Sequence, residues 1–597
     1  MNNYLVNLKI NNKPVSVEEG TTILDAAKKL NFKIPTLCNH PDLKVAGNCR
    51  ICVVEQKGAK TLVASCATPV SEGMEILTNS GKVREARKTV IELLLSEHNA
   101  DCTKCFKNGN CELQEIAAEY CVGDHVYLDL VQQKDKMPDI SSPSISKDDS
   151  KCIRCQRCVR TCADIQSVSA LAVINKGDQQ RISTFFGKPL DDTVCTNCGQ
   201  CINRCPTGAL TERTYLEEVW DLINDPNVHT IVQTAPAVRI ALGEDLGFEV
   251  GTRVTGKLVA ALKNIGFDSV LDTDFTADLT IMEEGTELLT RLKKVLVDKD
   301  ESVALPMTTS CSPGWIKFLE HAFPEQIPNL STCKSPQQMF GPLTKTYYAQ
   351  KKGLKAEHIA SISIMPCTAK KFEAIRPEMR DSGYQDVDYV LTTRELAMMI
   401  KQAGIDFMSL EDEEYDSIMG KSSGAGVIFG ATGGVMEAAL RTAYEIVTGR
   451  EVPFKNLNIM PVRGMEGVKE ATIKIEGTIP DWNFLEGAEL KVAIAHGLSN
   501  ARQIMTKVKN GEGGYHFIEV MACPGGCLGG GGQPIPTSPE IRQKRTEAIY
   551  AEDEGLPIRK SHENPEIANI YADFLKEPLG HKSHDLLHTH YTARKKY

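Results

Sequence analysis

The chain has 597 residues, of which 42% are hydrophobic and 24% are charged, proportions that are ordinary for a globular protein. The net charge of −10 disfavours a nucleic-acid-binding surface, and no run of about 18 apolar residues indicates a membrane span. The first residues lack the basic and apolar regions of a signal peptide, so we expect a cytoplasmic protein.

The 21 cysteines are the unusual feature of this composition. In a reducing compartment cysteines are rarely paired as disulfides, so metal binding or catalysis is the better explanation. Most of these cysteines also occur in clusters rather than singly. The sequence therefore predicts a protein with several metal centres.

Residues 1–80 are predicted to form a small α/β domain with a β-hairpin around Asn11-Asn12 and a helix that begins at Thr22. Four cysteines follow with the spacing C-x10-C-x2-C-x13-C: Cys38, Cys49, Cys52 and Cys66. Four thiolates on the loops of one small domain favour a [2Fe–2S] cluster, because soft sulfur ligands suit iron–sulfur centres. A zinc ribbon is the alternative, which the long first gap and the single C-x2-C disfavour.

Residues 81–130 are predicted to form a second module that begins with an amphipathic helix over 82–98. Four residues would line the apolar side of this helix: Val83, Ala86, Val90 and Leu94. Four possible metal ligands follow: His98, Cys102, Cys105 and Cys111. A histidine in place of one thiolate would give a less negative [4Fe–4S] cluster, and a Cys3His zinc site is the alternative.

Residues 133–150 are polar, contain proline and serine, and are predicted to be a linker. The run C-x2-C-x2-C-x3-C, typical of bacterial ferredoxins, occurs twice within residues 140–215. In such pairs the fourth cysteine of each run ligates the other cluster. We therefore expect two [4Fe–4S] clusters, one held by Cys152, Cys155, Cys158 and Cys205, the other by Cys195, Cys198, Cys201 and Cys162. These clusters predict an electron-transfer function.

Residues 216–535 alternate strand-like apolar runs, among them TIVQTAP, SISIMPC and KVAIAHG, with helical stretches, which indicates an α/β domain. Five cysteines lie in this region: Cys311, Cys333, Cys367, Cys523 and Cys527. Glycines crowd around the last two, and glycine lets a backbone approach a bound object closely. Both thiols are therefore predicted to hold a bulky group. No complete phosphate or dinucleotide motif occurs, so we expect no flavin or nicotinamide site in this chain.

Three segments of this region resemble, in order, the three signature segments of the [FeFe]-hydrogenases: TTSCSPGW (308–315), MPCTAKKFE (365–373) and EVMACPGGCLGGGGQP (519–534). The resemblance extends over nearly the whole chain, because the cluster-bearing front half resembles the large multi-cluster members. It implies a multidomain α/β and α+β protein. The implied parts are a plant-ferredoxin-like β-grasp domain (1–80), a His/Cys3 module (81–130), a bacterial 2[4Fe–4S] ferredoxin domain (140–215), a two-lobed α/β H-cluster domain (216–535) and a small C-terminal helical unit (536–597).

The family resemblance implies an H-cluster, which is a [4Fe–4S] cubane joined through one cysteine sulfur to a di-iron unit with CO, CN⁻ and a dithiolate. Cys367 and Cys523 would be cubane ligands and Cys527 the bridging ligand. Lys370 resembles the family lysine that hydrogen-bonds a cyanide, a charge-assisted bond that would orient and tune the metal. Three more residues are expected to bind the cofactor: Met365, Met521 and Gln337. Ordinary core packing would explain the methionines equally well.

The pair Cys311-Ser312 departs from the family, whose first segment usually has two adjacent cysteines, a proton donor and the fourth cubane ligand. In one alignment Cys311 is the proton relay and Ser312 stands at the ligand position, where a hard oxygen suits a cubane poorly. In the other, Cys311 is the ligand and Ser312 or a water serves the proton path. We prefer Cys311 as the ligand, because it completes a set of four thiols. This assignment leaves Cys121 and Cys333 as packing residues.

Four further residues match the family's proton path to the surface: Glu284, Glu287, Ser331 and Arg291. Buried carboxylates relay protons when desolvation raises their pKa toward the working pH. Without the resemblance, the acidic segment EEGTE would be read as the solvated first turn of a helix.

The resemblance thus implies reversible H2 oxidation and proton reduction, with electrons relayed through the front clusters. The expected partners are a ferredoxin, flavin- and NAD(P)-binding subunits, or both, together with hydrogenase maturation proteins. Two alternatives stay open, because residues 1–215 also resemble the large iron–sulfur subunit of respiratory NADH dehydrogenases and Ser312 leaves room for a hydrogen-sensing or iron–sulfur assembly protein.

Overall fold

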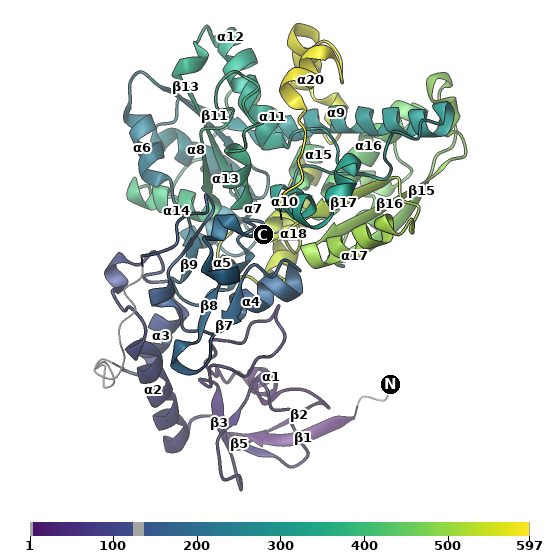
Figure 1. Cartoon of the computed structure of the whole chain (residues 1–597). Coiled ribbons are helices and arrows are strands. Elements are labelled where there is room, and N and C mark those ends of the chain that lie inside the picture. Colours follow the sequence, from purple (N-terminus) through teal and green to yellow (C-terminus); the bar gives the residue numbers. More distant parts are fainter. Residues whose placement is uncertain (1–3, 123–136, 596–597) are drawn as a thin grey trace. The chain divides into compact units, whose positions relative to one another are not determined.

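The computed structural model describes residues 4–122 and 137–595, which divide into two compact units (Figure 1). The smaller unit contains Met1–Asp164, Ser169–Leu190 and Arg204–Thr211, and the rest of the chain forms the larger unit. Within the described ranges, no helix is both long enough and apolar enough to cross a membrane.

The first part of the smaller unit is a five-stranded sheet with the order β2-β1-β5-β3-β4 and one helix, α1 (Ile23–Lys29). Its strands are β1 (Leu5–Ile10), β2 (Lys13–Glu18), β3 (Val53–Gln56), β4 (Val63–Ala64) and β5 (Glu75–Leu77). The predicted hairpin joins β1 and β2, with Asn11 and Asn12 at φ of 49° and 65°, as a type I′ turn requires. The Thr22 hydroxyl caps α1 by accepting the N–H of Asp25, which confirms the predicted helix start.

The next module contains helices α2 (Gly81–Ser96) and α3 (Glu112–Glu119). The predicted apolar side of α2 is only partly correct. Val83 is buried, and Val90 and Leu94 are half-buried and pack against a core, whereas Ala86 is half-buried. The prediction missed the other buried residues, which are Arg87, Ile91, Leu95 and Ser96. The guanidinium of Arg87 can be buried because it donates hydrogen bonds to the carbonyl of Val53 (2.8 Å) and to the hydroxyl of Tyr120 (2.9 Å).

The predicted linker over 133–150 is only partly correct. Residues 133–136 lie outside the described residues, but β6 (Ile145–Lys147) pairs with β9 (Leu210–Glu212) in a two-stranded sheet. Asp139 and Lys147 also form an antiparallel bridge, so the chain is already structured there. The remaining short elements are α4 (Arg157–Arg160), β7 (Ala172–Ile174), β8 (Arg181–Ser183) and α5 (Gln200–Arg204).

The larger unit contains two four-stranded sheets, in agreement with the predicted two-lobed α/β domain. The first sheet is parallel with the order β11-β10-β13-β14, and the second has the order β12-β17-β16-β15 with β15 antiparallel at its edge. Their strands are β10 (His229–Thr234), β11 (Ser269–Asp272), β12 (Met307–Thr308), β13 (Ile359–Met365), β14 (Tyr389–Thr392), β15 (Val468–Lys474), β16 (Glu489–His496) and β17 (Phe517–Met521).

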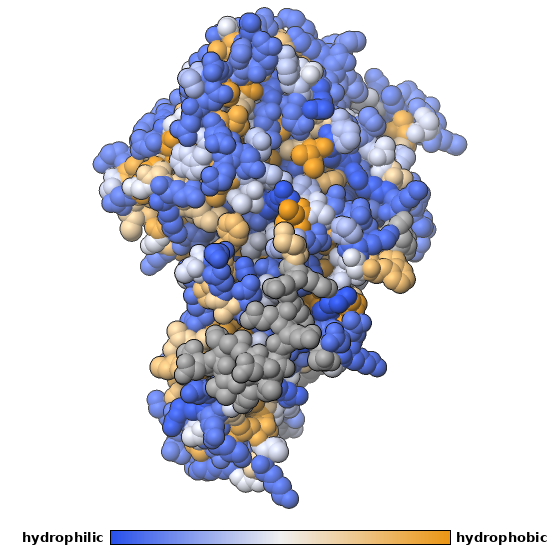
Figure 2. All heavy atoms as spheres, turned by 60° about the vertical axis from the view of Figure 1, so that its left-hand side comes forward, coloured by the Kyte–Doolittle hydropathy of each residue, from blue (hydrophilic) through white to orange (hydrophobic). Residues whose placement is uncertain are grey.

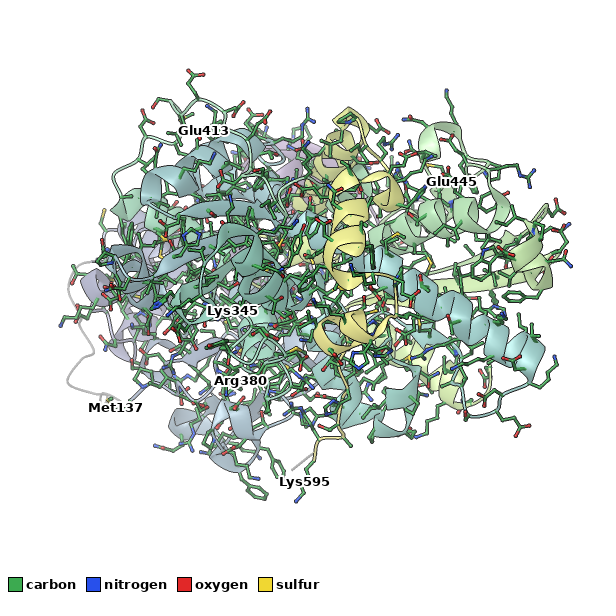
Figure 3. The ribbon with its side chains drawn as sticks, turned by 90° about the horizontal axis from the view of Figure 1, so that it is seen from above. Met137, Lys345, Arg380, Glu413, Glu445 and Lys595 are labelled. Atoms are coloured by element: carbon green, nitrogen blue, oxygen red, sulfur yellow. The ribbon has the colours of Figure 1, made fainter. Side chains whose placement is uncertain are left out.

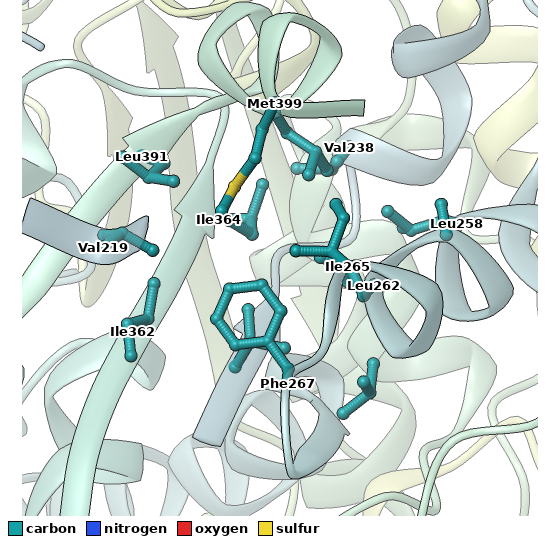
Figure 4. Packing of buried hydrophobic residues seen from close by; sticks show 14 of the residues in the cluster. Val219, Val238, Leu258, Leu262, Ile265, Phe267, Ile362, Ile364, Leu391 and Met399 are labelled. Carbon is teal, nitrogen blue, oxygen red and sulfur yellow. The ribbon is translucent and has the colours of Figure 1, made fainter. Parts of the chain in front are cut away.

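Helices cover both faces of each sheet. The main ones are α6 (Leu216–Asn224), α8 (Thr255–Ile265), α9 (Thr273–Lys293), α10 (Pro313–Ala322), α11 (Pro336–Leu343), α13 (Ala369–Ala374), α14 (Thr393–Gln402), α16 (Gly434–Thr448) and α17 (Leu498–Lys509). Three short helices accompany them: α7 (Val238–Ala241), α12 (Ala349–Lys352) and α15 (Gly424–Val427). On β10, Val232 belongs to the core that includes residues of α6, α8 and α14, whereas its neighbour Ile231 belongs to the core with residues of α9 and α11. Figure 4 shows the first of these cores, with Val219 of α6, Leu258 of α8 and Met399 of α14. Every residue of β13 is also buried, because helices cover both faces of its sheet.

The last helices of the chain are α18 (Pro539–Gly555), α19 (Pro565–Ile570) and α20 (His581–Leu587). Seen from above, these C-terminal elements lie between the helices of the two sheets (Figure 3). Ile570 and Leu587 share one apolar core with Phe275 of α9 and Phe340 of α11. The face of the molecule drawn in Figure 2 is mainly hydrophilic, with apolar side chains in small separate groups.

Candidate metal centres

The four cysteines of the first domain lie together in the structure. The thiol of Cys52 is 3.4 Å from the sulfur of Cys66, and the backbone N–H of Cys49 donates to the sulfur of Cys38 at 3.5 Å. Hydrogen bonds from Cys49 and Cys66 lower the pKa of Cys38 to about 2, and a hydrogen bond from Cys66 lowers the pKa of Cys52 to about 6. The same hydrogen bonds raise the pKa values of Cys49 and Cys66 above the usual range. The close approach of the four sulfurs, rather than the charge of any one of them, therefore fits an iron–sulfur cluster.

His98 follows α2 and has the properties of a ligand rather than of a packing residue. Its Nδ1 atom is buried and has no hydrogen-bond partner, and burial lowers the pKa of the ring, which keeps the ring neutral. Burial raises the pKa of Cys111, and Cys105 contributes to the same shift. A Cβ atom on Gly208 would lie 2.5 Å from the sulfur of Cys105, so only glycine leaves room beside this thiol. A buried, neutral imidazole nitrogen without a hydrogen-bond partner is available to bind a metal.

Four cysteines from the two ferredoxin-type runs surround one cavity of about 420 Å³ in the smaller unit: Cys152, Cys155, Cys158 and Cys205. Burial raises the pKa of Cys152 to about 11 and of Cys155 to about 12, and the Cys205 thiol adds to both shifts. Four thiols around one buried space are the arrangement that the ferredoxin spacing predicts. For the other predicted site, Cys162 belongs to the smaller unit and Cys195, Cys198 and Cys201 to the larger one, so that ligand set stays a prediction.

A further candidate site is a cavity of about 690 Å³ at the carboxyl ends of strands from both sheets of the larger unit. Strand β13 ends at Met365 and leads to Cys367, and strand β17 ends at Met521 and leads to Cys523. All four side chains line the cavity, together with Cys527, Cys311 and Ser312. Parallel strands deliver their carboxyl ends to one edge, which is where α/β proteins place ligands.

The sulfur ligands and polar groups of this cavity fit an iron cofactor. Burial raises the pKa of Cys367 to about 12 and of Cys527 to about 11, while the cation of Lys370 opposes both shifts. The backbone N–H groups of Ala369 and Lys370 also favour the thiolate of Cys367. Gln337 lines the cavity, and its buried Oε1 atom has no hydrogen-bond partner. Bound iron would offset the cost of burying these anions.

Lys370 is positioned partly by Glu373 and Ser335, which the sequence patterns did not indicate. Its Nζ atom donates to Glu373 Oε2 (2.8 Å), to the Ser335 hydroxyl (2.7 Å) and to the carbonyl of Cys311 (3.1 Å). Gln337 donates to the same carboxylate oxygen at 3.2 Å. The i,i+3 spacing of Lys370 and Glu373 on one helix was the available signal.

Cys311 and Ser312 have different surroundings. Burial raises the pKa of Cys311 well above its usual value, and Glu284 and Cys527 are the next largest contributors. The Ser312 hydroxyl accepts the N–H of Ala522 at 3.2 Å, beside Cys523 in the chain. The charge of Glu284 therefore raises the pKa of Cys311, whereas Ser312 contacts the loop that carries Cys523.

The acidic segment after Ile281 lies in the middle of α9 rather than at a helix start. Glu284 and Glu287 are both buried, so the solvated-turn explanation does not apply. Burial, assisted by Glu287, raises the pKa of Glu284 to about 8. The Ser331 hydroxyl donates to Glu287 Oε2 at 2.9 Å, and Arg291 donates to Glu287 Oε1 at 2.6 Å. These four residues form a continuous polar group beside Cys311.

The two cysteines assigned to packing have different surroundings. Cys121 is exposed, which contradicts a packing role. Cys333 is fully buried and joins an apolar core, but its sulfur also contacts Glu287 and His588. Among the described residues, no cysteine forms a disulfide.

Family comparisons cover nearly the whole chain. The iron only hydrogenase large subunit, C-terminal domain, matches residues 228–531, and the iron hydrogenase small subunit matches residues 539–594. A 2Fe-2S iron-sulfur cluster binding domain matches residues 4–81. The NADH-ubiquinone oxidoreductase-G iron-sulfur binding region matches residues 87–125, and the ferredoxin-like domain of NADH-quinone oxidoreductase subunit 3 matches residues 142–211.

Individual relatives agree with these matches. The NADP-reducing hydrogenase subunit HndD of Solidesulfovibrio fructosivorans is 51% identical over 99% of this chain and 100% of its own length. Iron hydrogenase 1 of Clostridium pasteurianum is 41% identical over 98% of this chain and 99% of its own. The solved structure of a variant of apo [FeFe]-hydrogenase HydA1 from Chlamydomonas reinhardtii is 45% identical, with a TM-score of 0.57, and covers 64% of this chain and 100% of that one.

Three observations agree. They are the matches to the hydrogenase large and small subunit domains, the identity to HndD over almost the full length, and the thiol-lined cavity. The chain belongs to the iron-only, or [FeFe], hydrogenases, as a catalytic subunit that carries 2Fe–2S and 4Fe–4S modules ahead of its hydrogenase domain.

Proposed function

We propose that this chain holds one [2Fe–2S] cluster, three [4Fe–4S] clusters and an H-cluster, and exchanges electrons between hydrogen and NAD(P)-linked partner subunits. The observation that carries this proposal is the buried cavity between the strand ends, which is lined by Cys367, Cys523 and Cys527 and bordered by Lys370. When bound, the H-cluster would supply the metal centre at which H2 is formed or split. The protein would supply the ligands, a largely apolar pocket, a proton route and an electron route.

The sulfurs of Cys367, Cys523 and Cys527 would hold the cofactor, and Met365 and Met521 would wall it. Lys370 is already oriented by Glu373 and Ser335, and its charge would face the anionic ligands of the metal. Gln337 offers an unpaired Oε1 atom to the same space. These contacts support the roles that the family resemblance implies for these residues.

We further propose Cys311 as the inner end of the proton route and Ser312 as the residue that faces the cubane. This reverses our preference from the sequence, because Glu284 influences Cys311 whereas Ser312 contacts the Cys523 loop. Replacing Cys311 by Ser should stop turnover while the electron paramagnetic resonance signal of the cubane stays. Replacing Ser312 by Cys should change that signal. Loss of the cubane in C311S would instead identify Cys311 as a ligand.

The proton route would run from Cys311 through Glu284, Ser331 and Glu287 to Arg291. Glu284 holds a proton at neutral pH because its pKa is about 8, so it can donate inward and be reloaded from outside. The Ser331 hydroxyl donates to Glu287 and connects the two carboxyl groups. Arg291, which is only partly buried, donates to Glu287 Oε1 at 2.6 Å and would form the outer end of the route.

The electron route would reach the cavity through the second ferredoxin-type run. Cys198 contributes to the pKa of Cys523, and Gly199 lies against Gly531, so the two cluster-binding loops are in contact within the larger unit. The Gln200 side chain also donates to the carbonyl of Gly529 at 2.8 Å. A short path through packed backbone favours electron transfer between two metal centres.

The proposed partners are subunits that bind flavin and NAD(P), because this chain contains no complete dinucleotide motif and HndD is named as a subunit of an NADP-reducing hydrogenase. A ferredoxin is a second electron partner, and maturation proteins would insert the di-iron unit. We propose a cytoplasmic location, since thiolate-held clusters suit a reducing compartment.

Infrared spectroscopy and coupled activity assays test the proposal in turn. The matured protein should show carbonyl and cyanide bands and should evolve H2 from a reduced viologen dye. Addition of the flavin- and NAD(P)-binding subunits should then couple H2 oxidation to NAD(P)⁺ reduction. Absence of the infrared bands would exclude the H-cluster, whereas bands without activity would favour the sensing alternative.

A further inference from the structure

Three possible metal ligands meet in the buried space between α9 and the end of the chain. The sulfur of Cys333 is 3.7 Å from Glu287 Oε2 and 3.9 Å from His588 Nδ1. All three ligand atoms lie within 4.8 Å of one another, and all three residues are buried. The sequence patterns had assigned Cys333 to packing and had not singled out His588.

The backbone holds these residues in place from two directions. Cys333 and His588 form an antiparallel bridge, flanked by hydrogen bonds from Thr589 N–H to the carbonyl of Thr332 and from Lys334 N–H to the carbonyl of Leu587. Glu287 comes from α9, on which Glu283 lies four residues earlier and so on the same face. The site therefore joins segments that are more than 250 residues apart in the chain.

His588 is oriented as a metal-binding histidine usually is. Its Nε2 atom faces Glu283 Oε2 at 3.2 Å, and the hydroxyl of Tyr571 (2.6 Å) and the N–H of Leu579 (2.8 Å) donate to the same carboxylate. Glu283 is thus held in place behind the imidazole ring. The Nδ1 atom on the other side of the ring lies 2.8 Å from the Thr332 hydroxyl and 3.9 Å from the sulfur of Cys333. A carboxylate behind the imidazole is the usual support of a zinc-binding histidine.

We propose that Glu287 Oε2, Cys333 Sγ and His588 Nδ1 bind a zinc ion or a similar divalent cation. Zinc takes one sulfur, one imidazole nitrogen and a carboxylate oxygen at about 2.0–2.3 Å, and ligand atoms bound at those distances lie less than 5 Å apart. The Thr332 hydroxyl, 2.8 Å from His588 Nδ1, or a water would take the fourth position.

The charges of the surrounding groups also favour a dication. With the thiol ionised, the group would contain three anions, Glu283, Glu287 and Cys333, against the single cation of Arg291. A divalent ion would balance that charge. Binding would release the thiol proton, because zinc binds thiolate and not thiol.

The consequence of binding rests on the proposed function. Glu287 belongs to the proposed proton route, and a zinc ion on its Oε2 atom would replace the hydrogen bond from Ser331. Protons would then no longer pass between Glu284 and Arg291. The site would make hydrogen turnover sensitive to zinc without any contact with the H-cluster cavity.

Zinc K-edge absorption spectroscopy tests binding without any measurement of activity. The protein with all its iron clusters filled is incubated with one equivalent of zinc and desalted. We expect one bound zinc with one sulfur neighbour near 2.3 Å and nitrogen or oxygen neighbours near 2.0–2.1 Å. C333A should lose the sulfur neighbour and H588Q should bind zinc at least tenfold more weakly, whereas C121A, which removes the exposed cysteine, should match the parent protein. No retained zinc, or an unchanged spectrum in C333A, would overturn the site.

An activity measurement separates this proposal from the proposed function. Zinc should inhibit H2 evolution from a reduced dye in the parent protein, and at least tenfold more zinc should be needed in C333A. A zinc site with the expected neighbours but undiminished H2 evolution would support the site and contradict a proton route through Glu287. Equal inhibition of both proteins would show that zinc inhibits elsewhere.

Discussion

Glu284 is a carboxyl group whose chemistry is set by its position. An exposed glutamate titrates near 4.5, but Glu284 is 3% exposed, has one unpartnered oxygen and lies near the anion of Glu287. Desolvation penalises the charged form, so its pKa rises to about 8. Since the folded pKa is above the unfolded value, the charged form destabilises the fold as the pH rises from about 4.5 through 8.

Infrared difference spectroscopy should detect this titration directly. A protonated carboxyl band should disappear as the pH is raised through about 8, and E284Q should lack the band because an amide cannot ionise. E284Q should also slow H2 evolution by at least a hundredfold, since general acid–base groups contribute about 10²–10⁴ to rates. Full activity in E284Q would exclude Glu284 from the proton route.

At the scale of elements, the glycine run after Cys527 allows loops to approach each other. A Cβ atom on Gly530 would lie 2.1 Å from the carbonyl oxygen of Pro366, and one on Gly531 would lie 2.2 Å from that of Cys198. Neither backbone oxygen can move without shifting the loop that carries Cys367 or Cys198. The run therefore joins the segments that carry Cys198, Cys367 and Cys527.

Substitution of Gly531 by Ala should separate the Cys198 loop from the cavity. We expect electron transfer from the ferredoxin-type clusters to the cavity cofactor to slow by at least tenfold, measured by rapid-mixing reduction of the matured protein. Gly81→Ala is the matched control, because a Cβ atom there meets nothing within 4 Å. Equal rates in G531A and in the control would show that this contact does not set the electron route.

At the scale of the larger unit, a buried ion-pair network ties the C-terminal helices to the hydrogenase domain. Asp553 of α18 accepts hydrogen bonds from Arg441 of α16 (2.9 and 3.0 Å) and from Arg559 (2.6 and 3.0 Å). Burial alone would raise the pKa of Asp553, but the hydrogen bonds and charges of the two arginines outweigh this effect. The net pKa is below its usual value, so the carboxyl stays charged. Its stabilising contribution is present at neutral pH and is lost as the pH falls through the folded pKa.

Removal of this charge should destabilise the protein strongly. D553N takes this carboxylate away from the buried guanidinium of Arg441, which keeps only Glu437 as its anion, and from the half-buried guanidinium of Arg559. Removing one partner of a buried ion pair costs about 3–5 kcal/mol. Calorimetry should show a lower unfolding temperature for the transition of the larger unit. D573N, which removes an exposed partner of Lys351, is the control and should barely change that temperature. An equal change of the unfolding temperature in D553N and D573N would show that the ion-pair network does not hold the C-terminal helices to the hydrogenase domain.

Most of the correct predictions rest on the spacing of residues that are close together in the sequence. Cys152, Cys155 and Cys158 are ligand candidates because each lies three residues after the one before it in the sequence. The Thr22 cap likewise joins residues that are three positions apart. The buried face of α2 was predicted only in part, because apolar periodicity cannot show that Arg87 is buried by its hydrogen bonds to Val53 and Tyr120. The start of β6 was missed because its pairing strand lies some 60 residues later.

The amino-acid sequence alone determined which chemistry this chain can support, since the types and short spacings of the cysteines specify cluster classes before any fold is known. The tertiary structure decided which distant residues share a site. Ser331 with Glu287, Ser335 and Glu373 with Lys370, and His588 with Cys333 meet only once both sheets and the C-terminal segment are assembled. Side-chain environments, and therefore the raised pKa of Glu284, arise from burial that no local pattern encodes.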